Sequence, residues 1–288
     1  MKKLTTVLAA LALAVGLFAG PALAAPKVKL AYVEWSCATT STYMVKAALE
    51  KMGYDVEVLP VAAAAMWQAT ASGDVDGLVT AWLPVTHKDY LARVKDKVEV
   101  VRPITGGARL GWAVPKYVTI DSMTELKDHP DQFDKKIIGI DPGAGEMALS
   151  EKAMERYGLS KWNLVEGSGA TMTAALGDAI KNHRWIVVTA WSPHWMFGRW
   201  DLKYLEDPDK MLGGEEHIDT VVRKDLKKDD PNLYKFFQNF YWKSPEQFQM
   251  VMDWNQQPGA DPLKSAQKFI KENPDMFKEW TKGMKKVD

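Results

Sequence analysis

The sequence lacks several features that would suggest particular functions. Its 288 residues include one cysteine, Cys37, so no disulfide can form within the chain. Basic and acidic side chains number 37 each, which removes any overall attraction to nucleic acid or to an anionic membrane. No His, Cys, Asp or Glu residues have the spacing of a zinc or calcium site. We therefore expect no metal, no cofactor and no nucleic-acid partner.

The N-terminus has the three parts of a secretory signal peptide. Lys2 and Lys3 precede an apolar run over residues 4–19, and the small-x-small motif Ala22-Leu23-Ala24 follows. We expect residues 1–25 to be cleaved and the mature protein to be periplasmic. The apolar run is short for a membrane span, which disfavours the alternative of an uncleaved anchor. No cysteine follows the cleavage site, so we expect no lipid anchor.

The rest of the chain alternates between apolar runs typical of strands and segments typical of helices. Such alternation indicates an α/β fold, with parallel sheets covered by helices. The pattern occurs twice, and a mostly helical segment follows. We predict that residues 26–108 and 213–288 form lobe 1 and that residues 109–212 form lobe 2. Gly106-Gly107 and Gly213-Gly214 are candidate hinge crossings, although ordinary surface turns are an equal alternative.

Tryptophan is abundant, with twelve residues, and three of them occupy related positions. The stretches DGLVTAWLPVTH and RWIVVTAWSPHW share the motif VTAW-x-P, in which Trp82 and Trp191 end predicted strands. Trp35 ends a third, KLAYVEW. In open α/β sheets ligands bind beyond the carboxyl ends of the strands, so these side chains are candidates to face one another across an inter-lobe cleft. For any single tryptophan, core packing is the alternative.

A box of indole rings suits a quaternary ammonium group. The ring face attracts a cation, and the methyl groups of the cation are apolar and carry no N–H to donate. A sugar stacked on the rings is the rival ligand. Sugars need many side-chain donors and acceptors, whereas Thr, Ala, Pro and Gly dominate near these strand ends. The composition therefore favours the cation.

Two further features predict a site for an anionic group. In IIGIDPGAGEMALSEKAM, the amides of Gly143, Ala144 and Gly145 precede a helix, where free N–H groups and the helix dipole attract an anion. The glycines could instead serve only the turn. His87 follows the Pro84 turn and could donate to a carboxylate, or it could be a capping or surface histidine. Together these features and the box describe a small zwitterion.

At this point the sequence resembles the substrate-binding proteins of ABC importers for glycine betaine and related solutes. The resemblance rests on YVEW, MWQATASGDVDG, AWLPVTH, GIDPGAG, GATMTAALGDAI and AWSPHWMF, which follow in order through the chain. It implies a two-lobe periplasmic-binding-protein fold with a hinge and an inter-lobe ligand cleft. It also implies a cage of Trp35, Trp82 and Trp191 around the ammonium group. The ligand carboxylate would be bound by the residues His87, Gly143 and Ala144.

Because of one departure from the family, the sequence does not fix the identity of the ligand. The family often carries acidic residues directly after VEW, whereas Ser36-Cys37-Ala38 stands here. Choline, carnitine, proline betaine or a sulfonium analogue are therefore alternatives to glycine betaine. We expect a monomer that delivers its ligand to a membrane permease with its ATPase. The rivals are a sensory ligand-binding protein and an exported enzyme using Cys37 or His87.

Overall fold

Nine strands form the centre of the molecule. The structure, a computed structural model, describes residues 25–287, so the predicted signal peptide lies outside them except for its last residue. The strands follow the order β2-β1-β3-β9-β4-β7-β5-β6, and β8 lies beside β4. Their bounds are β1 Lys27–Tyr32, β2 Asp55–Pro60, β3 Gly77–Leu83, β4 Val98–Pro115, β5 Lys136–Ile138, β6 Asn163–Val165, β7 Val188–Ser192, β8 Leu202–Tyr204 and β9 Glu216–Arg223.

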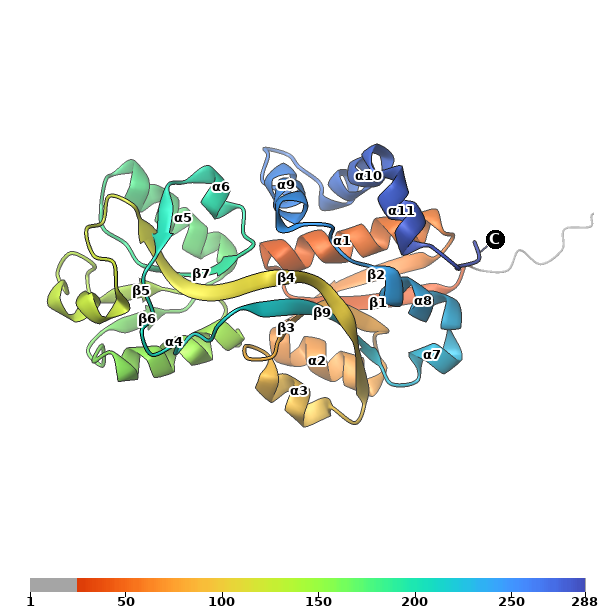
Figure 1. Ribbon diagram of the computed structural model, residues 1–288, viewed down its shortest axis with the longest axis horizontal. Helices are drawn as coiled ribbons and strands as arrows, with labels where there is room; N and C mark the ends of the chain where they lie inside the picture. The colour runs from red at the N-terminus through yellow and green to blue at the C-terminus, as the bar shows by residue number, and fades with distance from the viewer. Residues whose placement is uncertain (1–24, 288) are drawn as a thin grey trace, which may run out of the picture.

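The helices cover the strands in two groups, one on each side of the molecule (Figure 1). The first group flanks β1, β2 and β3 and the second flanks β5, β6 and β7. The bounds of the first group are α1 Ser36–Lys51, α2 Ala63–Ser72, α3 Lys88–Val94, α7 Leu226–Asp229, α8 Pro231–Asn239, α9 Pro245–Asn255, α10 Pro262–Glu272 and α11 Pro274–Trp280. The second group comprises the 3-10 helix Met123–Asp128, α4 Gly145–Arg156, α5 Gly169–Lys181 and α6 Met196–Arg199.

Two long strands connect the lobes. β4 pairs with β9 in its first part and with β7 from Arg109 onward, so one continuous strand passes from lobe 1 into lobe 2. Gly106 and Gly107 lie within this strand, and Gly213 and Gly214 lie just before β9. Figure 1 shows β4 and β9 side by side where the chain crosses. The boundary expected after residue 108 thus falls inside a strand, and the exact lobe limits stay a prediction.

The expected parallel pairing is found for only some of the strands. β1 pairs in parallel with β2 and β3, and β5 pairs in parallel with β6 and β7. However, β9 runs antiparallel between β3 and β4, and β4 runs antiparallel to β7 and β8. The reason is topological, because a chain that crosses to the second lobe and returns must send one of the two connecting strands in each direction.

The C-terminal helices pack against α1. α9, α10 and α11 lie over α1 on one face of the sheet, and α2 and α3 lie on the other (Figure 1). Trp242 and Trp280 are buried among phenylalanine rings, and the Trp242 Nε1–H donates to Ser41 Oγ of α1 at 3.0 Å. These tryptophans therefore fill a core, so the C-terminal segment stabilises the lobe that carries two of the three predicted cage residues.

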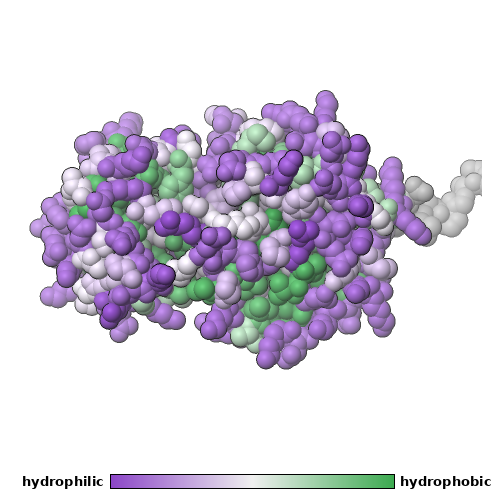
Figure 2. Space-filling model, in the orientation of Figure 1, coloured by the Kyte–Doolittle hydropathy of each residue, from purple (hydrophilic) through white to green (hydrophobic). Residues whose placement is uncertain are grey.

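The visible surface is mainly polar. Figure 2 shows hydrophilic side chains over most of this face, with an apolar area over the Ala-rich helix α2, where Ala64 and Ala65 are exposed. Within residues 25–287, no helix combines the length and the apolar character that crossing a bilayer requires.

Candidate ligand-binding site

The three predicted cage tryptophans line a single cavity between the lobes. Trp82 is the penultimate residue of β3 and Trp191 the penultimate residue of β7, while Trp35 follows β1 and is the N-cap residue of α1. Their exposed fractions are only 5% for Trp35, 3% for Trp82 and 2% for Trp191. The matching VTAW-x-P motifs thus end corresponding strands of the two lobes, and both continue with a cis X-Pro bond.

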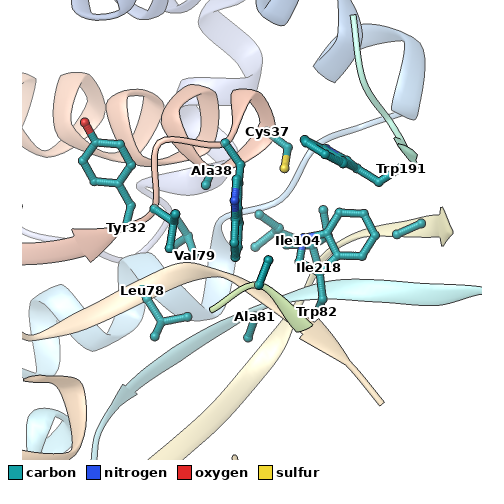
Figure 3. Close-up of a cluster of buried hydrophobic side chains, with 14 of the residues drawn as sticks. Tyr32, Cys37, Ala38, Leu78, Val79, Ala81, Trp82, Ile104, Trp191 and Ile218 are labelled. Carbon is teal, nitrogen blue, oxygen red and sulfur yellow. The ribbon is translucent and has the colours of Figure 1, made fainter. Parts of the chain in front are cut away.

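The wall of the cavity is mainly apolar. Both lobes contribute to its wall. The lining residues are Trp35, Cys37, Trp82, Thr86, His87, Leu110, Ile140, Ala144, Gly145, Glu146 and Trp191. The structure therefore brings five of the six predicted site residues together, and Gly143 is the one that does not line the cavity. Cys37 lies beside Trp191 (Figure 3).

Direct contacts between the lobes show that the lobes are closed against each other. The Trp35 Nε1–H donates to the Asp141 carboxylate at 3.0 Å, and the Tyr90 hydroxyl donates to the Gly143 carbonyl at 2.6 Å. Gly145 meets the backbone of Thr86, where a Cβ atom would come within 2.3 Å of the carbonyl oxygen. Real Cβ contacts are never this short, so a side chain at residue 145 would hold the lobes apart.

His87 presents one N–H group to the cavity. Its Nδ1 accepts a hydrogen bond from the Trp82 amide at 3.1 Å, which places the ring hydrogen on Nε2. Nε2 is buried and has no hydrogen-bond partner within residues 25–287. Burial lowers the pKa of His87 to about 3, so the ring is neutral at physiological pH. The side chain does not cap α3, and it is not at the surface.

The N-terminus of α4 supplies further donors. The Ala144 amide donates to the Asp141 carbonyl at 2.8 Å and is therefore already occupied. The amides of Gly145 and Glu146 begin the helix, and neither donates to another group in the described part of the chain. Because the first amides of a helix lack partners within it, these two point outward along the axis and suit an anion.

Glu146 is a further residue of the site, beyond those predicted from the sequence. Its carboxyl group is 3% exposed, lines the cavity, and accepts a hydrogen bond from the Ala190 amide at 2.8 Å. Burial raises its pKa well above the ordinary value. The signal in the sequence is its place directly after the glycines of the predicted anion site, in the first turn of the helix.

The loop after β3 is held by a second buried carboxylate. Glu216 of β9 accepts hydrogen bonds from the Val85 amide at 2.6 Å and the Thr86 amide at 2.8 Å, and also from the Thr86 hydroxyl. Glu216 lies where the chain returns from lobe 2 to lobe 1. It therefore links the crossing strand to the loop that leads to His87.

Within residues 25–287, no cluster of His, Cys, Asp and Glu could hold a metal ion.

Comparisons with known proteins agree with this geometry. The family model described as the substrate binding domain of the ABC-type glycine betaine transport system (OpuAC) matches residues 26–272. The glycine betaine/carnitine transport binding protein GbuC of Listeria monocytogenes is 44% identical over 164 residues, which are 56% of this chain and 54% of that protein. The match thus spans about half the length of this relative.

Two solved structures share the fold. Lactococcal OpuAC, closed and complexed with glycine betaine, has a TM-score of 0.85 and 41% identity, covering 89% of this chain and 100% of its own. An ABC-transporter choline binding protein in complex with choline also has a TM-score of 0.85, with 28% identity over 91% of this chain and 93% of its own. The chain therefore belongs to the OpuAC family, the substrate-binding domains of ABC-type glycine betaine transport systems.

Proposed function

We propose that the protein is the extracytoplasmic solute-binding component of an ABC importer and that it captures glycine betaine between its lobes. The observation that carries this proposal is the meeting of Trp35, Trp82 and Trp191, from both lobes, around one closed cavity. A desolvated cation over an indole face gains about 2 kcal/mol or more. Three such faces favour a methylated onium group.

The polar part of the same wall suits a carboxylate. His87 offers a neutral Nε2–H that is buried and without a partner among the described residues. The α4 terminus offers the amides of Gly145 and Glu146. The sequence predicted donors at Gly143 and Ala144. The Ala144 amide already donates to the Asp141 carbonyl, and Gly143 does not line the cavity. We therefore assign the carboxylate donors to the amides of the next two residues. A zwitterion fits this wall, because its cationic group would contact the indole rings while its carboxylate would accept from His87 and the α4 amides.

The proposed mechanism is binding and closure without chemistry. The ligand enters the open cleft between lobe 1, residues 26–108 and 213–288, and lobe 2, residues 109–212. Closure then brings Trp191 and the α4 amides onto it, and the ligand stabilises the closed form through its higher affinity for that form. The closed monomer would present the ligand to a membrane permease with its ATPase, after export and cleavage of residues 1–25 to the periplasm.

Calorimetric titration of the mature protein tests the ligand class. Glycine betaine should bind. The affinities for choline, carnitine, proline betaine and a sulfonium analogue would show which other onium compounds the site accepts. A neutral disaccharide such as maltose is the control and should give no binding. Binding of the sugar, with no response to any onium compound, would overturn the proposal.

An enzymatic role for Cys37 lacks support. Burial raises the pKa of this thiol to about 12, and a thiol that stays protonated is a poor nucleophile. A Cys37→Ala variant should keep its affinity for glycine betaine within a few-fold, and the wild-type protein should release no product after long incubation with it. Appearance of a product in wild type but not in Cys37→Ala would favour the enzyme instead.

A further inference from the structure

Glu146 gives the cavity an acidic group that the binding of a zwitterion does not require. It is the sole acidic side chain among the lining residues. Its one recorded hydrogen bond joins a carboxyl oxygen to the Ala190 amide, next to Trp191 in β7. No basic side chain among residues 25–287 forms an ion pair with it, and apolar surroundings govern its ionisation. The carboxyl group therefore lies in the ligand cavity without a counter-ion.

The other titratable groups around the cavity keep one charge state near neutral pH. Burial holds the pKa of His87 at about 3 and that of Cys37 at about 12. Behind Glu146, burial raises the pKa of the Tyr204 hydroxyl, and the Arg109 guanidinium stacks on the Tyr204 ring. Burial raises the pKa of Glu146 well above its ordinary value, so among the lining groups its carboxyl group is the one whose ionisation moves from the acidic range toward neutral pH.

Two carboxylates near the cavity have partners of their own. Asp141 accepts from Trp35, and Glu216 accepts from the amides of Val85 and Thr86. These hydrogen bonds satisfy acceptor oxygens at both positions, whereas the carboxyl group of Glu146, a residue that lines the cavity, accepts from a single amide.

Building on the proposed function, we propose that Glu146 is a specificity-determining residue that matches the charge of the cavity to the ligand by gaining or losing a proton. A closed, apolar cavity tolerates little net charge. A zwitterion brings none, so the carboxyl group stays protonated beside it. A cation without a carboxylate, such as choline, brings one positive charge, which ionised Glu146 balances. One cavity thus accepts both classes of onium compound.

The charge balance fixes the sign of the pH dependence. At a pH where Glu146 is ionised in the open protein, binding a zwitterion requires uptake of a proton, so affinity for glycine betaine falls as the pH rises. Binding choline instead favours the ionised form, so affinity for choline holds or rises over the same range. The limiting slope for one linked proton is tenfold in Kd per pH unit.

Titration of glycine betaine and choline at pH 6, 7, 8 and 9 tests the inference. In the wild type, the preference for glycine betaine over choline should fall as the pH rises, by up to tenfold per pH unit where Glu146 loses its proton. In Glu146→Gln, which keeps the shape and the oxygen that accepts from Ala190, the preference should stay constant within about twofold and choline should bind more weakly. Glu151→Gln, the same change on the exposed side of α4, should behave as the wild type.

Proton exchange in the wild type gives an independent measurement that needs no variant. Calorimetry at pH 8 in buffers of different ionisation enthalpy should show proton uptake with glycine betaine and none, or release, with choline. If both ligands bind with a constant preference and no proton uptake, Glu146 only supports β7 and this inference fails while the proposed function stands. If choline fails to bind even at pH 9, the inference also fails. If neither ligand binds at any pH, both fail.

Discussion

The indole Nε1–H of Trp35, in lobe 1, donates a hydrogen bond to the carboxylate of Asp141, in lobe 2, at 3.0 Å. Trp35 lines the ligand cavity, so one side chain both bounds the site and joins the lobes. Asp141 also accepts the Ala144 amide through its backbone carbonyl, which shapes the turn before α4. The hydrogen bond that joins the lobes therefore also fixes a side chain of the cavity wall. That wall is complete only when the lobes meet.

Asp141→Ala should weaken ligand binding without unfolding the protein. The variant removes one inter-lobe hydrogen bond to a carboxylate that is partly exposed, a loss of about 1 kcal/mol and thus about fivefold in Kd. Titration calorimetry gives the affinity, and small-angle scattering gives the closed fraction with ligand. Asp131→Ala, at an exposed position of the same lobe, is the control. Unchanged affinity in Asp141→Ala would mean that this bond does not favour closure.

Trp82 should contribute through its ring face as well as its size. Trp82→Ala should raise the Kd for glycine betaine by roughly thirtyfold, equivalent to about 2 kcal/mol, and Trp82→Phe should lose less because an aromatic face remains. Both variants need a circular-dichroism check, since the residue is buried. Equal losses for Ala and Phe would argue against attraction between the cation and the ring.

His87→Ala should distinguish ligands that have a carboxylate from those that do not. Loss of the free Nε2–H removes a donor that a carboxylate would use, so glycine betaine should lose about tenfold or more in affinity. Choline, tested on the same variant, reports any loss that arises only because the Trp82 amide is left unpaired. Similar losses for the two ligands would contradict the assigned role.

The fold class could be predicted from local patterns, but its strand directions could not. Alternating strand and helix segments indicated two α/β lobes, and the structural neighbours have that architecture. Sequence periodicity carries no information on which strands lie side by side. The antiparallel placement of β9 between β3 and β4 depends on contacts between residues more than a hundred positions apart.

The aromatic part of the site was easier to anticipate than the polar part. Trp82 and Trp191 are marked by a repeated motif at strand ends, where the fold class itself directs side chains to the cleft. The polar contacts depend on the path of a short loop. Ala144 turns its amide back onto Asp141, and this leaves Gly145 and Glu146 at the helix start. A one-residue difference in such a turn is not encoded in any local pattern.

Two buried histidines should make the protein less stable in acid. Burial lowers the pKa of both His87 and His194 to about 3, against about 6.5 when unfolded. Between these values the unfolded chain binds more protons, so the free energy of unfolding falls as the pH drops below about 6.5, by up to about 1.4 kcal/mol per pH unit for each histidine. Urea unfolding at pH 7 and pH 5 should show a smaller acid loss in His194→Gln than in wild type. His183→Gln, at an exposed position, should match wild type.

Gly145→Ala should prevent closure through one added methyl group. Its Cβ would lie 2.3 Å from the Thr86 carbonyl oxygen and 2.7 Å from the Thr86 Cγ2, so the lobes would have to separate. Each lobe keeps its own core, and α4 gains a better helix former, so the unliganded variant should unfold at or above the wild-type temperature. Ligand affinity should nevertheless fall at least tenfold in titration calorimetry.

Gly143→Ala is the matched control for this substitution. A Cβ atom at residue 143 would meet only the Tyr90 hydroxyl, at 3.9 Å, which is an ordinary contact. Affinity should therefore change by less than about threefold. The pair therefore separates a steric block between the lobes from a general effect of an added methyl group in this loop. If Gly145→Ala binds as tightly as wild type, the closed contact between Gly145 and Thr86 is not required for binding, and the donors at the start of α4 must act from a more open arrangement of the lobes.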